Sequence, residues 1–479
     1  MGGEPRLDHP NIVLVVMDTA RADAFEPFGA PAGSTPVLAQ MAREGDARTV
    51  FAPACWTVPS HAGLFSGLPY REAGFGRPAV NHADYRAAGD RLAGRWLPNV
   101  LRTRGYATAG TSANMWISDW GGWDRGFDQW EQVTSGRNLH GSGLSLHQRV
   151  AWARQAVAAR VDDGLSEIEQ TYRRWLAGRH ADRPFFWFFN LVECHSPYLP
   201  PKPFTPLGPS GRVRAGEDAL RYLNFNAIWK GLCSRTDAPP AALERMRKLY
   251  QAAVTMMDAW VGRLLETLQS TELLDDTIVV VTSDHGENLG ENGLLGHGFS
   301  LDNRLIRVPL ISRGISAPLE GPAPSLCDVA GWLADSAGIP GHPWSVGDGR
   351  VAVAQFDAPA TLDDPASAEA VRVWGLGDAA LERLTTSFAC AVDGRLKLIR
   401  RQGREELVDL EADPLEAAPA AIGPDLEAKW RPELAVARAA LDKAEEEARP
   451  GVLGAEEDNS RSRDEVEAME SQMKLLGYL

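Results

Sequence analysis

The chain is poor in cysteine. Its 479 residues include five, and these are Cys55, Cys194, Cys233, Cys327 and Cys390. The number is odd and no C-x-x-C pair occurs, which excludes a disulfide framework or a zinc ribbon and fits reduced thiols. Because reduced thiols are typical of a reducing compartment, we expect a cytoplasmic protein.

Positive charge is also scarce, since the formal net charge at pH 7 is −15. Non-specific nucleic-acid binders hold phosphate backbones with a basic surface, which this composition does not supply. We therefore expect no nucleic-acid-binding surface. An anionic substrate would have to be met by local positive charge, such as that of a metal ion.

Long apolar runs are missing as well. No run approaches the roughly 18 residues that span a bilayer. Residues 1–10 are polar and lack the basic and apolar regions of a signal peptide. The sequence thus predicts no membrane partner.

The apolar residues that are present form short runs. The run at 11–17 is too short for a core helix and rich in β-branched residues, so it predicts a buried strand of a parallel sheet. Similar strands are expected at 106–111, 185–190, 277–282 and 308–312. Helical patterns lie between them at 90–104, 146–176 and 241–268. This alternation indicates an α/β protein with a doubly wound, mostly parallel sheet.

The pattern changes towards the C-terminus. Short strands at 351–356, 371–374, 387–392 and 396–399 predict a small antiparallel α+β subdomain. We expect a catalytic domain over 1–345, this subdomain over 346–423, and a charged helical tail over 424–479 docked on the body. Val466, Met469 and Met473 give the last segment an amphipathic spacing.

Polar residues follow several of the predicted strands. Asp18 follows the first, Asp284 and His285 follow the 277–282 strand, and Glu193 and His195 follow the 185–190 strand. In open α/β sheets, ligands bind beyond the carboxyl ends of the strands. Each residue alone could be a turn or cap residue, but carboxylates and an imidazole converging on one edge predict a divalent metal site.

A second feature is the sequence CWTVPSHAGLFSG at 55–67. Pro59 fits the first turn of a short helix that Gly67 ends, which places Thr57 at its N-terminus. There, free backbone N–H groups and the helix dipole favour an anion. Thr57 is either a simple N-cap or, if a cation activates its hydroxyl, a nucleophile.

Several segments together resemble the sulfatase family of the alkaline phosphatase superfamily. The stretch TVPSHAGLFSG at 57–67 is similar to the sulfatase signature, in which a nucleophile-x-Pro-Ser-Arg core opens a helix. The stretches VVMDTARAD and TSDHGE resemble the two metal-binding strand ends of the family. Further resemblances, in the same order as in the family, lie at 190–198, 296–298, 406–416 and 476–479.

The resemblance implies a set of site residues. Asp18, Asp284, His285 and the Thr57 hydroxyl would bind a divalent metal ion. One ion is favoured, a second is left open, and zinc, manganese and calcium are not distinguished. His195 would bind substrate oxygens or protonate the leaving group. The same roles are implied for His297, while Asn114 would contact a substrate oxygen, and Arg21 and Glu287 would support the site.

Two departures from the family pattern bear on the reaction. Sulfatases have Cys or Ser where Thr57 stands, and that residue is matured to a formylglycine aldehyde, which threonine cannot form. Cys55 lies two residues too early to replace it. The arginine that follows Pro-Ser in the family is His61 here. An unmodified threonine resembles the phosphodiesterases and phosphotransferases of the superfamily, so we expect hydrolysis of a small anionic phosphate mono- or diester through a phosphothreonine intermediate.

Three alternatives remain open. A sulfatase working without formylglycine would use the same residues, and a phosphotransferase would differ only in its acceptor. A non-catalytic binding scaffold would keep the fold without the reaction. The tryptophans at 116, 120, 123 and 130 could line a substrate pocket, although packing is the favoured interpretation.

Overall fold

The computed structural model describes residues 9–76, 82–133, 158, 162–315, 317–359, 361–363 and 365–448. Its centre is a seven-stranded sheet in the order β2-β9-β6-β1-β5-β3-β4. The middle strand β1 pairs in parallel with β5 on one side and β6 on the other. The strands are β1 (Asn11–Met17), β2 (Asp46–Phe51), β3 (Ala107–Ser112), β4 (Gln129–Gln132), β5 (Phe185–Leu191), β6 (Thr277–Thr282) and β9 (Arg307–Arg313).

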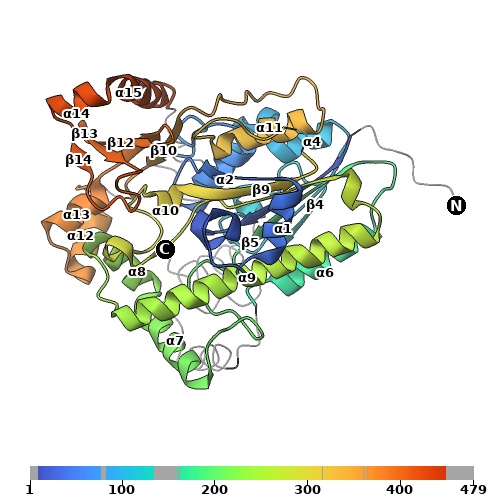
Figure 1. Cartoon of the computed structure of the whole chain (residues 1–479), viewed down its shortest axis with the longest axis horizontal. Coiled ribbons are helices and arrows are strands. Elements are labelled where there is room, and N and C mark those ends of the chain that lie inside the picture. Colours follow the sequence, from blue (N-terminus) through green and yellow to red (C-terminus); the bar gives the residue numbers. More distant parts are fainter. Residues whose placement is uncertain are drawn as a thin grey trace.

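Helices cover both faces of this sheet, which explains why β1, β5 and β6 are buried along their whole length. Figure 1 shows α1, α6 and α9 on one side of the sheet and α2, α4 and α11 on the other. The doubly wound α/β architecture expected from the sequence is confirmed. These helices are α1 (Pro36–Glu44), α2 (Thr57–Ser66), α4 (Leu97–Thr103), α6 (Leu165–Ala177), α9 (Pro240–Ser270) and α11 (Val329–Ser336).

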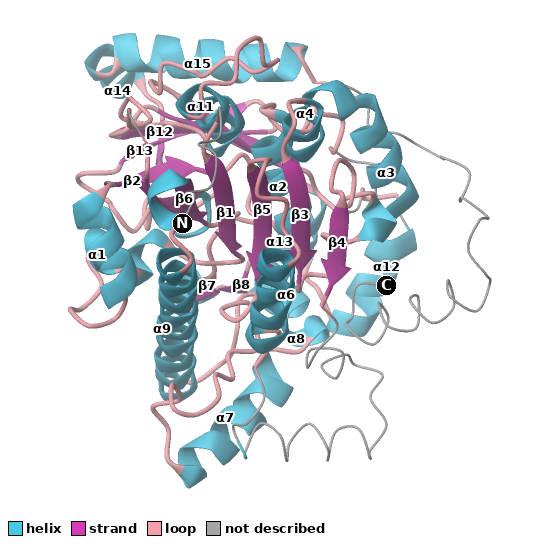
Figure 2. Ribbon diagram, turned by 90° about the vertical axis from the view of Figure 1, so that its right-hand side faces the viewer, coloured by secondary structure: helices cyan, strands magenta, loops and turns pink. Residues whose placement is uncertain are grey.

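The parallel strands β1, β5, β3 and β4 lie side by side with their arrowheads at one edge in Figure 2. The sheet departs from the expected direction at β9, which runs antiparallel to both β6 and β2. The chain between β6 and β9 contains the small hairpin of β7 (Asn288–Leu289) and β8 (Leu295–Gly296), with a 3-10 turn at Glu291–Gly293 between them, and the one-turn helix α10 (Asn303–Ile306). It therefore lacks the long helical crossover that a parallel return needs.

A second sheet follows, with five antiparallel strands in the order β10-β11-β12-β13-β14. One face packs on α15 through Leu434, Ala437 and Leu441. The other face packs on the segment after β8, where Phe356 contacts both Phe299 and Phe388. These elements are β10 (Ala352–Phe356), β11 (Phe388–Val392), β12 (Leu396–Arg401), β13 (Arg404–Asp409), β14 (Ala420–Ala421), α14 (Pro424–Lys429) and α15 (Arg431–Glu446).

Two expected elements are wrong. Residues 371–374 belong to α12 (Pro365–Trp374), which with α13 (Asp378–Thr385) lies between β10 and β11. In this helix Val371 and Trp374 are partly buried against the neighbouring core cluster, whereas Val373 is 53% exposed. The helix expected over 90–104 is interrupted, because α3 (His82–Arg91) ends before a 3-10 turn at Ala93–Arg95 and α4 begins with Pro98 in its first turn. The second half of the 146–176 pattern forms α6, whereas residues 146–157 and 159–161 and the final amphipathic segment lie outside the described residues.

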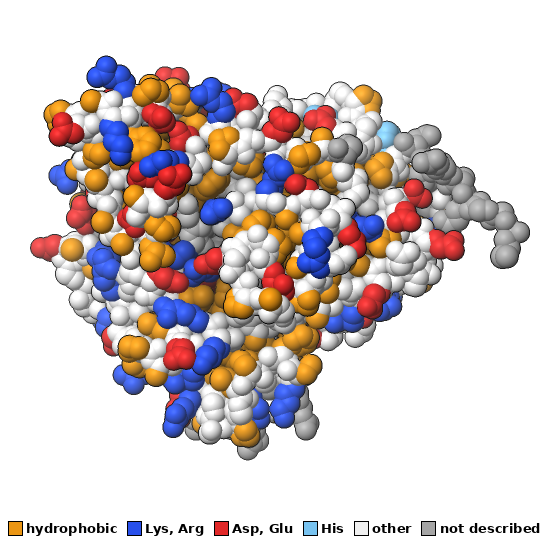
Figure 3. Space-filling view, in the orientation of Figure 1, with side chains coloured by type: hydrophobic (Ala, Val, Ile, Leu, Met, Phe, Trp, Pro, Cys, Tyr) orange, Lys and Arg blue, Asp and Glu red, His pale blue; other side chains and the backbone are white. Residues whose placement is uncertain are grey.

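The remaining described helices lie near the lower end of α9 in Figure 1, and these are α7 (Pro209–Tyr222) and α8 (Phe225–Ser234). None of the described helices combines the length and the apolar content needed to cross a membrane. On the face shown in Figure 3, basic and acidic side chains are interspersed.

The N-terminus of α1 is capped by a residue from another helix. Asp258 of α9 is 1% exposed, and its two carboxylate oxygens accept hydrogen bonds from Val37 N (3.2 Å) and Leu38 N (2.8 Å). Thr35, the N-cap residue of α1 in the chain, makes no capping bond of its own. Asp258 thus ties α1 to α9 by satisfying backbone groups that the helix cannot pair internally.

We expect Asp258→Ala to lower the free energy of unfolding by about 1–3 kcal/mol, because two backbone donors at the start of α1, one buried and one partly buried, lose their acceptors. Urea unfolding followed by circular dichroism measures the change. Asp258→Asn keeps one carbonyl oxygen and should lose less. Equal losses in the two variants would contradict the capping role.

Candidate functional site

The carboxyl ends of β1 and β6 bring three residues together. Asp18 follows β1, and Asp284 and His285 follow β6. Each offers one ligand atom, and these atoms lie within 4.8 Å of one another. All three side chains are fully buried. The pairing of β1 with β6 therefore produces the cluster expected from the sequence.

The environment of Asp284 fits a cation. Its Oδ1 accepts hydrogen bonds from Thr19 N (3.1 Å) and His285 N (2.8 Å), which fix the carboxyl group. Among the described residues, none donates a hydrogen bond to Oδ2. Burial, and then the negative charge of Asp18, raise the pKa of Asp284 well above its usual value. A divalent ion would offset both the burial of the Asp284 charge and its repulsion from Asp18, because the ion neutralises adjacent carboxylates and coordinates the unbonded oxygen.

The imidazole of His285 is also oriented to bind a cation. Its Nδ1 lies 2.9 Å from the carbonyl oxygen of Gly286, which can only accept, so Nδ1 carries the proton and donates. Nε2 therefore presents a lone pair. Burial, and then the neighbouring His297, lower the pKa of His285 well below its usual value, so the ring is neutral. A neutral imidazole with a fixed tautomer is a suitable metal ligand.

Thr57 reaches this cluster from helix α2, whereas the other three residues come from strand ends. It is the first residue of α2, its side chain is 4% exposed, and its Oγ1 lies 3.3 Å from His285 Nε2. Trp56, and not Thr57, occupies the N-cap position. The simple capping alternative is therefore wrong in this structure, and the hydroxyl lies where the first-turn N–H groups of α2 favour an anion.

Two further histidines lie beside His285. The ring centroids of His297 and His285 are 4.5 Å apart, and those of His297 and His195 are 5.0 Å apart. His297 Nδ1 lies 3.1 Å from Oε1 of the fully buried Glu287. Burial lowers the pKa of His297, but the Glu287 carboxylate outweighs it and raises the value overall. His195 Nδ1 donates to its neighbour's carbonyl, Ser196 O, at 2.9 Å.

The other residues singled out from the sequence lie around this group. Asn114, expected to contact a substrate oxygen, donates from Nδ2 to Asp18 Oδ2 at 2.6 Å. Arg21 forms ion pairs with Asp23 (2.6 Å) and Glu291 (2.8 Å). The second of these pairs joins the turn after β1 to the connection between β7 and β8.

His61 is drawn into the site more closely than its sequence position indicated. Its ring is fully buried one helical turn after Thr57. Nδ1 lies 3.0 Å from the Thr57 carbonyl oxygen and 3.5 Å from Asp284 Oδ2. Burial lowers the pKa of His61 to about 4, so the residue that replaces the arginine of the sulfatase signature is neutral.

Tyr250 supports the site without having been expected from the sequence. It lies within α9, and its hydroxyl donates to Thr19 O (2.7 Å) and accepts from Arg21 N (2.8 Å). Thr19 adopts a left-handed conformation with φ 62°. Tyr250 thus stabilises the strained turn that carries Asp18, but a tyrosine inside a helical pattern gives no signal of this role.

The remaining candidates have packing roles. Cys55 is fully buried, and burial raises its pKa to about 12, so it is an inert thiol. Trp123 is 1% exposed, and Trp116 and Trp130 pack against the same core cluster, which confirms packing for these three tryptophans.

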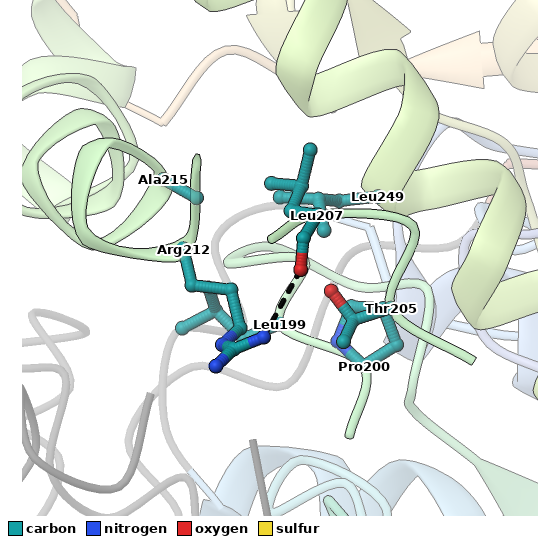
Figure 4. A pocket seen from close by; sticks show the side chains of 7 residues that line it. All are labelled: Leu199, Pro200, Thr205, Leu207, Arg212, Ala215 and Leu249. Atoms are coloured by element: carbon teal, nitrogen blue, oxygen red, sulfur yellow. Dashed lines mark hydrogen bonds between the residues drawn. The ribbon is translucent and has the colours of Figure 1, made fainter. Parts of the chain in front are cut away.

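A small surface pocket lies elsewhere and contains none of the candidate site residues. In Figure 4, Arg212 Nη1 donates to Leu207 O at 3.0 Å across it. It is lined by Leu199, Pro200, Thr205, Leu207, Arg212, Ala215 and Leu249.

Comparisons with known proteins concern the sequence and the fold. The sulfatase family model matches residues 10–320. Choline-sulfatase of Rhizobium meliloti is 32% identical over 188 residues, covering 38% of this chain and 34% of that protein. The multifunctional alkaline phosphatase superfamily protein PehA of Trinickia caryophylli is 39% identical over 155 residues, covering 29% of this chain and 30% of PehA. The chain thus spans about a third of these two curated relatives.

Solved structures show the same fold over almost the whole chain. The protein BT4656, solved with its substrate D-glucosamine-2-N,6-O-disulfate, has a TM-score of 0.64 and 18% identity, covering 95% of this chain and 100% of that one. The phosphonate monoester hydrolase of Agrobacterium radiobacter has a TM-score of 0.62 and 19% identity, covering 92% of this chain and 96% of that one.

We expect Mn²⁺ to bind this cluster and to raise the melting temperature. At about a hundred times its Kd, a bound ion adds about 2.7 kcal/mol of stability, which a chelator should remove. Differential scanning fluorimetry with and without a chelator measures this. Asp18→Asn should abolish the shift, whereas Asp275→Asn, at the opposite end of β6 with its side chain 86% exposed, should keep it. An equal shift in Asp18→Asn would place the ion elsewhere.

Proposed function

Because the chain belongs to the sulfatase family, we propose that it is a metal-dependent hydrolase of phosphate and phosphonate esters, with Thr57 as the nucleophile. The observation that carries this proposal is the position of Thr57 Oγ1, which lies at the start of α2 and 3.3 Å from His285 Nε2. The phosphonate monoester hydrolase fold among the structural neighbours supports the same class of substrate.

The reaction would proceed in two displacements. Thr57, with its hydroxyl proton already lost to solvent, attacks phosphorus through Oγ, a new P–O bond forms, and the bond to the leaving alkoxide or phenoxide breaks. A water then attacks the phosphothreonine and gives a proton to His297, the P–Oγ bond breaks, and Thr57 leaves as the alkoxide, ready for the next cycle. The first-turn N–H groups of α2 would stabilise the non-bridging oxygens in both steps.

His297 is the residue suited to proton transfer. Its Nδ1 is held by Glu287, and this carboxylate favours the protonated ring. Nε2 can therefore donate a proton to the departing oxygen in the first step and take one from the attacking water in the second. His195, with its Nδ1 bonded to a backbone carbonyl, would present Nε2 to a substrate oxygen.

The charge of the site bears on the substrate. A divalent cation held by Asp18, Asp284, His285 and Thr57 would balance the two carboxylates and lower the pKa of the Thr57 hydroxyl. Among the described residues, Thr57, Asp284 and His61 contact imidazoles, carboxylates and backbone groups, and burial lowers the pKa of His61 to about 4. These contacts include no lysine or arginine, which favours a singly charged ester, such as a phosphodiester or phosphonate monoester, over a doubly charged phosphate monoester.

A sulfate ester is the second candidate, because it is also singly charged and because sulfatases are among the relatives. It would be cleaved by the same threonine without formylglycine. Transfer to an alcohol in place of water is a further variant of the reaction. A binding scaffold without catalysis would show no turnover of any ester.

We expect the purified protein with Mn²⁺ to hydrolyse aryl phosphonate monoesters and phosphodiesters faster than aryl phosphate monoesters and sulfates. Thr57→Ala should lower kcat/KM about a thousandfold or more, while most of the Mn²⁺ binding remains. Acid quenching and peptide mass spectrometry should find the phosphoryl group on the peptide that contains Thr57. Full activity in Thr57→Ala would exclude the nucleophile, and no turnover with any metal would support the scaffold.

Removing the proton donor should matter most for poor leaving groups. We expect His297→Ala to slow an alkyl ester by about 10²–10⁴-fold and a nitrophenyl ester far less, because nitrophenolate needs no proton. Glu287→Gln should show the same trend to a smaller extent. His180→Ala, which removes an exposed histidine, is the control. A loss that is independent of the leaving group would exclude His297 as the acid.

A further inference from the structure

His61 is a fully buried polar residue that the proposed mechanism does not use. It replaces the arginine of the signature sequence, and it brings no positive charge. Its ring lies edge-on to Trp123 and Phe188, with centroids 5.9 Å and 6.1 Å away and interplanar angles of 80° and 90°. These two rings fix the plane of the imidazole.

The polar neighbours of His61 determine its tautomer. Nδ1 lies 3.0 Å from Thr57 O and 3.5 Å from Asp284 Oδ2, and both oxygens are acceptors. Nδ1 therefore carries the proton. Among the described residues, none hydrogen-bonds to Nε2. All of the polar interaction of the ring is thus made from one atom.

That atom lies between the two halves of the site. Thr57 O belongs to the first residue of α2, which supplies the nucleophile, and Asp284 Oδ2 belongs to the turn after β6. The other oxygen of Asp284 is already bonded to backbone N–H groups, so Oδ2 is the oxygen left for a cation. Oδ2 is flanked by His61 Nδ1 and by His285 Nε2, which is 3.4 Å away.

We propose that His61 is a positioning residue. Its Nδ1–H is bonded to the backbone carbonyl of the nucleophile and lies 3.5 Å from the Asp284 carboxylate, and it thereby sets both the affinity for the metal ion and the placement of Thr57. This proposal rests on the proposed function for its effect on turnover, but not for its effect on metal binding.

Substitution of His61 by asparagine or glutamine distinguishes a hydrogen-bonding role of the ring from a packing role. The amide nitrogen of asparagine can take the place of Nδ1, whereas that of glutamine reaches the place of Nε2. We expect His61→Asn to keep the Kd for Mn²⁺ within about threefold. His61→Gln and His61→Ala should weaken it by about 10–100-fold, as is typical when a group that orients a ligand is lost. Isothermal titration with Mn²⁺ alone measures these constants.

Phe65→Leu is the matched control. Phe65 lies one turn further along α2 and packs edge-on to the same two rings, Trp123 (6.0 Å) and Phe188 (5.0 Å), without a polar atom. This variant should lower the melting temperature and leave the Kd for Mn²⁺ unchanged. If it weakens Mn²⁺ binding as much as His61→Ala does, packing alone explains His61.

Other outcomes would also overturn the proposal. One is that the His61→Asn and His61→Gln variants have equal Kd values for Mn²⁺. The other is that the His61→Asn protein does not fold, because the proposal requires that the asparagine amide can replace the ring. The readouts keep the two proposals apart. If the wild-type protein binds Mn²⁺ and turns over no ester, the proposed function fails, whereas the order of the Kd values still decides the role of His61.

Discussion

The structure depends on the close approach of two buried carboxylates. Asp18 and Asp284 leave adjacent parallel strands at the same edge, and their ligand atoms lie within 4.8 Å of each other and of His285. Like charges at this distance in a dry environment repel strongly. The backbone donors of Thr19 and His285, the amide of Asn114 and the tautomer of His285 all arrange this cluster for a cation. The layers of the fold bring Thr57 and His297 to it.

The second sheet is joined to this site by a buried ion pair. Lys397 of β12 is fully buried, and its ammonium group donates to Glu416 at 2.7 Å and to Leu301 O. Glu416 in turn accepts a hydrogen bond from Asn303 N. Leu301 and Asn303 follow His297 by a few residues. The loop that supplies the proposed proton donor is therefore held by groups from the far end of the chain.

Contacts that follow from strand order could be predicted from the sequence. Contacts that depend on strand direction or on side-chain rotamers could not. Asp18, Asp284 and His285 could be predicted to meet, because parallel strands end at one edge. The antiparallel course of β9 depends on the short connection before it, and residues 371–374 fit a helix as well as a strand. The contact of His61 with Asp284 depends on the angle of α2 to the sheet, which no motif encodes. The division into domains and the roles of the site residues remain predictions.

The anchoring of the loop after β8 has a consequence for synthesis of the protein. The cluster at Asp18 and Asp284 can assemble once β6 has formed, but the ammonium group that holds residues 301–303 is supplied only when β12 is made, and its partner Glu416 comes later still. A nascent chain on the ribosome would therefore contain Asp18, Asp284 and His285 well before the anchor of the His297 loop is complete. Competence for the proposed reaction would appear late in translation, after Glu416 has been added.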